Sequence, residues 1–400
     1  YVEYVDNKLH LCKTLSSLNK KITAIKRDNK KYLQEVCDDT GWSMEKAKVE
    51  ADKIKRKYGL SYRKYSRYRF YEKTEEEAAE KINTWRNNSN KYVKIAMEAS
   101  GWSEEKVKKH MKRCGAEFDI IQAYYPLYQA WNLTDEQLDG YARQRISLNL
   151  DRKYNKLKDT RALADKALFN EIYKDYTGRK YWINKDTNFE EFKEFAKDIN
   201  YVFCKPIESG GGLGAEKHKV TADLKGLYDL LMAKDRLLVE ECIEQHEEIE
   251  EFARGCVNTI RVVVFNDANN ETHTICTGIR FGNGGVTDNF SHDGMVADID
   301  PETGIIRTHA IDKKGHIYST HPITGKKFIG FQIPNWEKVI QITHEAMSVQ
   351  EGVNYVGWDV AVCEDKVVLV EGNSAPDLVL IQAPYAPQFK GMKYLFEPYL

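Results

Sequence analysis

The pattern of hydrophobic and polar positions changes near residue 150. Residues 1–150 are rich in Lys, Glu, Tyr and Arg and hold few Gly or Pro residues, which is typical of packed helices. From residue 151 onward, short apolar runs and clustered glycines indicate β-strands with helices between them. We therefore expect two domains, a helical region at 1–150 and an α+β region at 151–400.

The sequence of the second region, residues 151–400, predicts mostly antiparallel strands. Helices are expected at residues 224–234 and 336–350, where the apolar positions follow a helical period. Strands are expected at residues 201–205, 236–240, 259–265, 272–281, 357–362 and 367–373.

The helical region contains an internal repeat. The segment from Thr40 to Lys46 resembles the segment from Ser100 to Lys106, and both contain Gly-Trp-Ser. Further along, residues 73–77 and 133–137 correspond at the same offset, each with a Thr followed by acidic residues. Ser or Thr before acidic residues is typical of a helix N-cap, so two copies of one helical unit are expected.

A tyrosine-rich stretch lies within the first copy. Residues 62–71 combine several Tyr with Arg63, Arg67 and Arg69. Such aromatic side chains can stack on a nucleic acid or another polymer, or pack one repeat against the other. We favour packing, because aromatic side chains supply large buried areas.

Overall composition limits the function classes. The chain has 60 basic and 61 acidic residues, so no global field favours nucleic acid or membrane surfaces. Its eight cysteines show no zinc-site spacing, which indicates reduced thiols. No apolar run approaches the roughly 18 residues of a membrane span, and no signal peptide opens the chain. We expect a cytoplasmic protein without nucleic-acid partners or membrane insertion; an oligomer through the Tyr-rich helices stays open.

Three oxygen-bearing side chains lie in the last two predicted strands. Asp359 interrupts the first apolar run, and Glu371 and Asn373 end the second. Because a buried carboxylate without a partner is costly, we expect the three to converge on one face. Carboxylate and amide oxygens are ligands that Mg²⁺ prefers, with positions left for phosphates. The strands therefore predict a magnesium site, with Mn²⁺ as an alternative metal.

A glycine-rich loop follows the predicted strand that ends at Lys205. It contains Ser209, Gly210, Gly211 and Gly212. Glycines allow backbone N–H groups to approach phosphate closely, and a nearby ammonium adds positive charge. The loop is not a Walker A sequence, because no Gly-Lys-Ser/Thr follows. A plain flexible turn is an equally good interpretation of this loop alone.

Two arginines lie in neighbouring apolar strands. Arg261 stands at the start of one strand and Arg280 near the end of the next. Arg can bind phosphate or carboxylate through two parallel hydrogen bonds, which Lys cannot; surface ion pairs are the alternative. A polar loop with Asn289 and His292 follows. His292 could act as a base, although one histidine in a polar loop is more often incidental.

The order of these elements resembles the ATP-grasp superfamily of ATP-dependent ligases. A strand ending in Lys-Pro, a glycine loop and a helix precede Leu238-Val239-Glu240-Glu241-Cys242-Ile243. The resemblance covers residues 160 to 385, and its C-terminal metal motif is specific. It implies an α+β ATP-grasp fold, in which two subdomains clasp ATP, preceded here by the α-helical N-terminal region.

The resemblance also implies roles for individual residues. Asp359, Glu371 and Asn373 would hold Mg²⁺. The lysines that contact ATP phosphates would be Lys166, in an Asp-Lys pair, and Lys205. The segment with Glu240, Glu241 and Ile243 matches the interdomain hinge whose backbone holds adenine, and either Glu247 or Glu248 would bind ribose.

More narrowly, five segments resemble the sugar-transfer-associated ATP-grasp branch, which is linked with surface-polysaccharide pathways. The N-terminal repeats are similar to extensions seen in that branch. In the related glutamate-ligase branch, an Asn-containing loop faces the active site, and the matching loop here contains Asn289. Some ATP-grasp ligases place an Arg two residues before the metal Asp, where this chain has Gly357; Arg280 would then stabilise the tetrahedral intermediate. The five segments are Asn258-Thr259-Ile260-Arg261, Asp288-Asn289-Phe290, His321-Pro322-x-Thr324-Gly325, Gly330-Phe331-Gln332-x-Pro334 and Gly357-Trp358-Asp359.

The resemblance implies an ATP- and Mg²⁺-dependent ligase. It would join a small-molecule carboxylate to an amine or amino acid through an acyl phosphate, with sugar-linked substrates among the options, in surface-polysaccharide or peptide-conjugate biosynthesis. Arg261, Arg280 and Asn289 are the expected catalytic side chains. Two alternatives are a kinase that phosphorylates a hydroxyl and a non-catalytic ATP-binding scaffold.

Overall fold

The computed structural model describes residues 33–34, 37, 43–58, 75–185, 187–207, 214–234, 237–291 and 293–400. Four features expected from the sequence lie outside these residues: the first Gly-Trp pair at 41–42, the tyrosine-rich stretch at 62–71, the glycine loop with Ser209, Gly210, Gly211 and Gly212, and His292. The chain divides into two compact units, Tyr1–Pro126 and Leu127–Leu400.

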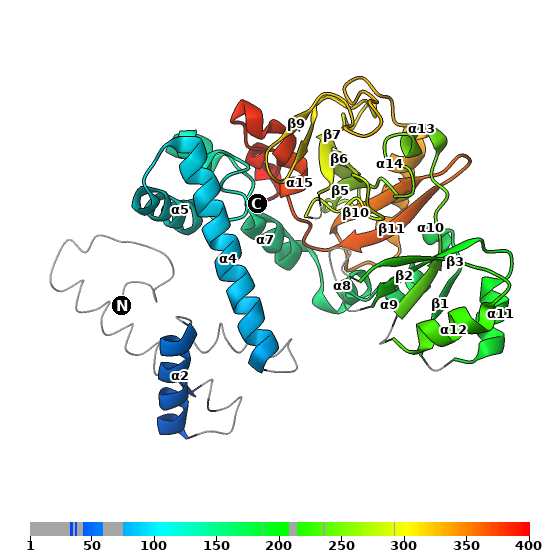
Figure 1. Cartoon of the computed structure of the whole chain (residues 1–400). Helices are drawn as coiled ribbons and strands as arrows, with labels where there is room; N and C mark the ends of the chain where they lie inside the picture. Colours follow the sequence, from blue (N-terminus) through cyan, green and yellow to red (C-terminus); the bar gives the residue numbers. More distant parts are fainter. Residues whose placement is uncertain are drawn as a thin grey trace. The chain divides into compact units, whose positions relative to one another are not determined.

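The first unit is helical in its described part. Its helices are α2 (Met44–Tyr58), α4 (Glu75–Ser100) and α5 (Glu104–Phe118) (Figure 1). The Ser43 side chain accepts a hydrogen bond from the Lys46 backbone N–H at 3.2 Å, and Ser103 accepts one from Lys106 at 3.4 Å. The serines of the two Gly-Trp-Ser motifs therefore cap two helices of 15 residues each.

The second unit opens with short helices. Helix α7 packs Ile146 and Leu150 against Val263 and Phe265 of the main sheet, so these residues share one hydrophobic core. The short helices are η2 (Ala130–Asn132), α6 (Asp135–Asp139), α7 (Gln144–Tyr154), α8 (Leu157–Ala164), α9 (Lys166–Ile172) and α10 (Lys174–Thr177).

A four-stranded antiparallel sheet forms the smaller layer of this unit. Its order is β1-β4-β2-β3, and it is covered by helices α11 and α12 (Figure 1). In β2, Val202 and Cys204 are buried while Tyr201 is exposed, the two-residue alternation of a sheet with one covered face. The elements are β1 (Tyr181–Ile183), α11 (Phe189–Ala196), β2 (Tyr201–Pro206), β3 (Glu216–Lys219), α12 (Leu224–Met232) and β4 (Leu237–Glu241).

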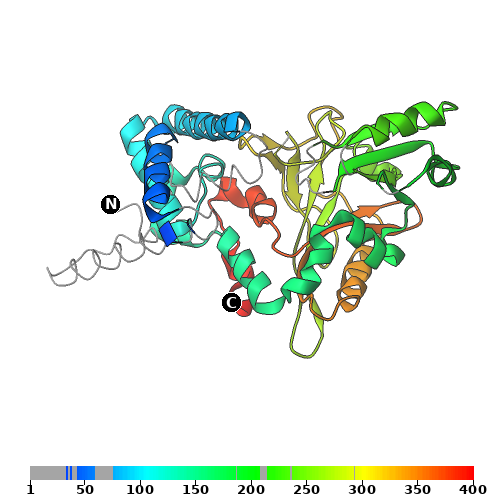
Figure 2. The ribbon, with the colours of Figure 1, turned by 90° about the horizontal axis from the view of Figure 1, so that it is seen from below.

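A seven-stranded antiparallel sheet forms the larger layer, in the order β11-β10-β5-β6-β7-β8-β9. Every residue of β10 is buried, because helices cover both faces of the central strands. Figure 2 shows α14 (orange) beside the last two strands, which it contacts. The elements are α13 (Glu247–Glu250), β5 (Ile260–Asn266), β6 (Thr272–Phe281), β7 (Met295–Asp298), β8 (Ala310–Asp312), β9 (Ile317–Tyr318), α14 (Trp336–Glu345), η3 (Ala346–Ser348), β10 (Tyr355–Val362) and β11 (Val367–Asn373).

The C-terminal segment closes the fold with one short α-helix and three 3-10 turns. The α+β class and the antiparallel strands agree with the sequence-based prediction. The helix expected at 336–350 ends earlier, at Glu345, and continues as the 3-10 turn η3. No helix in the described part of the chain is long and apolar enough to cross a membrane. The last elements are α15 (Val379–Gln382), η4 (Ala383–Gln388), η5 (Lys393–Leu395) and η6 (Glu397–Tyr399).

Candidate active site

Asp359 and Glu371 face each other across the pair formed by β10 and β11. The register also pairs Gly357 with Asn373, two positions further along. Directly opposed residues of an antiparallel pair lie on one face, and the side chain two positions along returns to that face. The structure therefore brings Asp359, Glu371 and Asn373 together. The register shifts directly after Asp359, so a bulge lies beside the two carboxylates.

Asp359 is fully buried and paired with both strand arginines. Arg261 Nε donates to Asp359 Oδ1 at 2.5 Å, and its Nη2 donates to Oδ2 at 3.1 Å. Arg280 Nη2 donates to the same Oδ2 at 2.8 Å. Burial alone would raise the pKa of Asp359, but the two guanidinium groups hold this pKa well below its ordinary value. Asp359 is therefore ionised, and neither arginine is a surface ion pair.

The pKa of Glu371 is shifted in the opposite direction to that of Asp359. Burial and the neighbouring charge of Asp359 raise the pKa of Glu371, which shares a hydrogen bond with Asp359. Asn373 turns its amide nitrogen toward Glu371 Oε1 at 3.4 Å. Two facing carboxylates that resist holding two negative charges, with an amide oxygen beside them, fit a divalent cation with oxygen ligands. The donor set is thus the one that the sequence predicts for Mg²⁺.

Glu240 pairs with two cationic side chains of the site. Lys205 Nζ lies 2.6 Å from Glu240 Oε2, and Arg179 Nη2 lies 2.7 Å from Oε1. Asn170 Nδ2 also donates to Oε1, at 3.1 Å. Burial raises the pKa of Glu240, but Arg179 and Lys205 outweigh it and lower the pKa to about 2. Glu240 therefore acts through its side chain, as a buried anchor for Lys205.

Lys166 lies near Lys205 without sharing its acidic partner. Its ammonium donates to the backbone carbonyls of Pro206 and Ile207 at 3.2 and 3.1 Å. Burial and the positive charge of Lys205 lower the pKa of Lys166. The two ammonium groups thus form a paired cationic site at the end of β2.

Arg280 joins Asp359 to a second carboxylate. Its Nε donates to Thr259 Oγ1 at 2.9 Å and to Asp288 Oδ2 at 3.2 Å. Asp288 Oδ2 also accepts a hydrogen bond from the Thr259 backbone N–H at 2.8 Å. Asn289 follows directly; its Oδ1 accepts from the Ser291 backbone N–H at 2.7 Å. Arg280 therefore has a fixed position between the two strands and the polar loop.

These groups line one cavity of about 1040 Å³ between the two sheets. Its lining includes Lys166 and Lys205 as well as Asp359, Glu371 and Asn373. The segment after β4 forms one wall, with side chains that include those of Ile243, Glu244 and Gln245. Of the predicted residues, the cavity gathers Lys166, Lys205, Glu240, Glu241, Ile243, Arg280, Asn289, Asp359, Glu371 and Asn373.

Other predicted residues lie elsewhere. Glu247 and Glu248 are exposed at the start of α13, whereas Glu244 and Glu250 line the cavity. Arg261 is only 4% exposed and contacts Asp359, but among the described residues the lining contains Arg280 rather than Arg261. A Cβ added to Gly357 would lie 2.6 Å from Pro376 Cβ and 3.1 Å from Arg261 Cδ. An arginine at position 357 would therefore collide with the arginine already behind Asp359.

Arg179 is the important side chain that the sequence did not reveal. Its Nη1 donates to the Leu369 carbonyl at 2.7 Å and its Nη2 to the Val370 carbonyl at 3.2 Å, while it also holds Glu240. It thus joins the small sheet to β11. Arg179 stands in a Gly-Arg-Lys turn before a three-residue strand, without motif or periodicity. Only its position before an apolar pair could have suggested burial.

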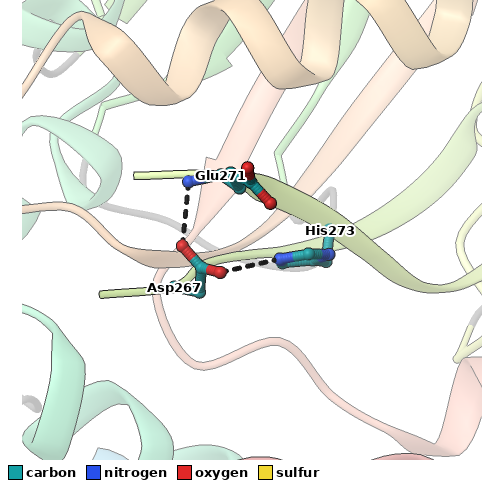
Figure 3. A group of neighbouring side chains, drawn as sticks. All are labelled: Asp267, Glu271 and His273. Atoms are coloured by element: carbon teal, nitrogen blue, oxygen red, sulfur yellow. Dashed lines mark hydrogen bonds and ion pairs between the residues drawn. The ribbon is translucent and has the colours of Figure 1, made fainter. Parts of the chain in front are cut away.

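A second group of metal-ligating side chains lies on the hairpin between β5 and β6 (Figure 3). Asp267 Oδ1 accepts hydrogen bonds from the backbone N–H groups of Asn269 and Glu271, at 2.8 and 2.9 Å. Its Oδ2 lies 3.2 Å from His273 Nε2. These contacts account for Asp267 as the residue that shapes the turn, so the group is assigned a structural role.

Residues 214–393 match the family described as sugar-transfer associated ATP-grasp. Over these residues the chain is similar to an ATP-grasp domain of that family. The matched segment contains β3 to β11 and therefore Glu240, Arg280, Asp359 and Glu371. Lys166 and Lys205 precede it in the sequence, but the same cavity receives them. No curated protein matches the chain.

The ATP-grasp domain is similar to solved structures at low identity. The ATP-grasp ligase PsnB complexed with minimal precursor shares 15% identity over 59% of this chain and 62% of its own, with a TM-score of 0.34. D-alanine-D-alanine ligase from Coxiella burnetii shares 12% identity over 61% and 58%, with a TM-score of 0.36. The corresponding Bacillus anthracis enzyme complexed with ATP shares 12% over 61% and 68%, with a TM-score of 0.37. The chain thus spans about three fifths of the length of the first two.

Proposed function

We propose that the chain is an ATP- and Mg²⁺-dependent ligase that joins a carboxylate to an amine through an acyl phosphate. The observation that carries this proposal is the set of charged side chains that line one cavity. The cationic Lys166 and Lys205 and the acidic Asp359 and Glu371 all line the same space of about 1040 Å³. A nucleotide triphosphate needs both: ammonium groups for its phosphates and carboxylates for their metal.

We assign each side chain a role according to the part of MgATP that it would contact. Lys166 and Lys205 would bind phosphate oxygens, because the backbone carbonyls and Glu240 that hold them fix their positions. Glu244, Gln245 and the backbone after β4 would surround the adenosine part, with Glu244 or Glu250 as ribose ligand in place of Glu247 or Glu248. Asp359, Glu371 and Asn373 would hold Mg²⁺, which when bound neutralises charge on the phosphates.

Arg280 and Asn289 also line the cavity and would contact the second substrate. A substrate carboxylate oxygen would attack the γ-phosphorus, with ADP leaving, to give an acyl phosphate. The amine nitrogen would then attack the carbonyl carbon, releasing inorganic phosphate and a proton. Arg280, held by Asp288 and Asp359, would stabilise negative charge on the carbonyl oxygen. Positioning and electrostatics would supply most of the catalysis.

The test is ADP formation with MgATP and pooled amino acids, amines and sugar acids, with hydroxylamine added in parallel. Hydroxylamine converts an acyl phosphate into a hydroxamate, which mass spectrometry identifies. Asp359→Asn and Glu371→Gln should abolish ADP formation, whereas the exposed Glu248→Gln should not. A phosphorylated hydroxyl product without hydroxamate would instead identify a kinase. Absence of nucleotide binding in the intact protein would favour a scaffold.

We further propose that the reaction belongs to surface-polysaccharide or peptide-conjugate biosynthesis; the sugar-transfer association in the family description supports the first of these. The cavity is large enough for a nucleotide and a further small substrate. We therefore extend the proposal to a small-molecule acceptor, sugar-linked or peptide-like, which the pooled assay distinguishes by product mass.

A further inference from the structure

The loop that carries Asp288 and Asn289 is held at both ends by two consecutive residues. At its start, the Gly282 backbone N–H donates to Asn258 Oδ1 at 3.0 Å. At its end, Asp288 accepts from the backbone N–H of Thr259 at 2.8 Å. Between these anchors, residues 284–286 are exposed, and Val286 lines the mouth of the cavity. The position of this loop therefore depends on Asn258 and Thr259.

Asn258 is fully buried and also forms hydrogen bonds with Gln245, on the side of the cavity that is proposed to bind the nucleotide. Its Nδ2 donates to Gln245 Oε1 at 3.0 Å, and its backbone N–H donates to the same oxygen at 3.0 Å. Gln245 Nε2 donates back to the Asn258 carbonyl at 2.8 Å. Gln245 belongs to the wall formed by the segment after β4. Asn258 is thus a common anchor for the two walls of the cavity.

His321 holds the other polar group of the same peptide unit, the Gly282 carbonyl. It is 1% exposed, and its Nε2 lies 2.9 Å from the Gly282 carbonyl. The Ile323 backbone N–H donates to Nδ1 at 3.3 Å. A carbonyl can only accept and a backbone N–H can only donate, so the ring is neutral with its proton on Nε2. Both ring nitrogens are satisfied in that form.

The turn that carries His321 is itself fastened to the domain. Thr324 Oγ1 donates to the Phe252 carbonyl at 3.3 Å. Lys326 Nζ donates to the Glu248 carbonyl and to Glu251, both at 2.6 Å. The turn therefore presents a fixed imidazole to Gly282, even though Ile323 at its tip is 63% exposed.

We propose that His321 is a positioning residue for the second substrate: with Asn258 it fixes the Gly282 peptide, and through it the loop with Asp288 and Asn289. This deepens the proposed function, on which it rests, by assigning the His-Pro-x-Thr-Gly segment to the acceptor side of the site. His321 contacts neither the proposed nucleotide ligands nor the proposed metal ligands. Its loss should therefore loosen the acceptor loop and leave nucleotide affinity unchanged.

The test is hydrogen–deuterium exchange of the full chain, followed in peptides that cover residues 282–291. In the free protein, His321→Leu removes the donor to Gly282 and should speed exchange in these peptides roughly tenfold. His321→Gln restores an N–H donor at a similar reach and should return exchange to within about twofold of wild type. Thr343→Val removes a buried hydroxyl that donates to the Val339 and Ile340 carbonyls within α14, outside this connection, and is the matched control that should leave residues 282–291 unchanged.

Two further readouts separate positioning from general destabilisation. Calorimetry with AMP-PNP and Mg²⁺ should give His321→Leu a Kd within about threefold of wild type, because one buried hydrogen bond away from the ligand is lost. Exchange in β2 and β4 should also stay unchanged. Equal exchange at 282–291 in wild type and His321→Leu, or equal loosening in the Leu and Gln variants, would overturn the proposal. If wild type binds no nucleotide, the proposed function fails, while the exchange comparison still decides the role of His321.

Discussion

Arg179 Nη2 lies 2.7 Å from Glu240 Oε1, and both side chains are at least nine-tenths buried. The same guanidinium donates to the carbonyls of Leu369 and Val370 in β11. One side chain therefore connects the small sheet, which supplies Lys205, to the strand that supplies Glu371. The placement of Lys205 relative to Glu371 therefore depends on this connection.

Removing Arg179 should destabilise the protein strongly. In Arg179→Met, the charge of Glu240 stays buried with Lys205 as its remaining cation, and we expect a loss of about 3–5 kcal/mol in the free energy of unfolding. Lys225 forms an exposed pair with Asp229 at 2.6 Å, so Lys225→Met should cost below about 1 kcal/mol. Urea unfolding of both variants measures the difference. Equal losses would show that Arg179 contributes no more than a surface ion pair.

Acid should remove the stabilisation that Glu240 provides. The pKa of Glu240 falls from an ordinary 4.5 to about 2 in the folded protein. A lowered pKa stabilises the fold fully above pH 4.5, and this contribution is lost as pH falls from 4.5 toward 2. The interval corresponds to roughly 3 kcal/mol. Unfolding between pH 5 and pH 2.5 should show a steeper loss for wild type than for Glu240→Gln; parallel curves would contradict the assignment.

The contrast between Asp359 and Arg179 shows what the sequence could reveal. Asp359 stands out because an acid inside an apolar strand needs a partner, and the antiparallel pairing with Glu371 follows from two adjacent runs. Arg179 gives no such signal, since its partners lie far away in the chain and β1 has only three residues. The strands β8 and β9, of three and two residues, are likewise too short for a pattern. Long, periodic elements were predictable; single long-range contacts were not.

Replacing Arg280 by lysine should reduce turnover while nucleotide binding survives. Arg280 contacts Thr259, Asp288 and Asp359 at once, a geometry that one ammonium cannot reproduce. We expect Arg280→Lys to lower the rate of ADP formation roughly hundredfold, with the Kd for AMP-PNP within a few-fold of wild type. Arg113→Lys, in an exposed pair with Glu117, is the control. A weakened Kd with unchanged turnover would place Arg280 on the nucleotide instead.

The neutral ring of His321 should make the protein sensitive to mild acid. Burial lowers the pKa of His321 from its ordinary 6.5, although its hydrogen bond to the Gly282 carbonyl acts in the other direction. The stabilisation is complete above pH 6.5 and is lost as pH falls from 6.5 through the lowered value, because the unfolded ring then takes up a proton that the buried ring does not accept. Urea unfolding at pH 7.5 and pH 5.5 should show a larger decrease for wild type than for His321→Gln. A larger decrease in the free energy of unfolding for His321→Gln than for wild type would contradict this prediction.

The acidic run after β4 allows one sharp test of the nucleotide assignment. The resemblance implied Glu247 or Glu248, but both are exposed, whereas Glu244 and Glu250 line the cavity. Glu244 precedes the single turn α13 and Glu250 ends it, so the placement of this turn decides which carboxylates reach the cavity. A sequence without periodicity in this run could not fix that placement.

Glu244→Gln and Glu250→Gln should therefore weaken nucleotide binding differently from the outward-facing glutamates. A carboxylate that accepts hydrogen bonds from ribose hydroxyls contributes about 1.5–3 kcal/mol, so the affected variant should lose roughly tenfold or more in affinity for AMP-PNP. Glu247→Gln removes the same charge from the same helix and should stay within about twofold, which controls for the long-range field. Calorimetry at one fixed salt concentration measures all three. If Glu247→Gln shows the largest loss, α13 is rotated in the nucleotide complex and the original sequence assignment holds.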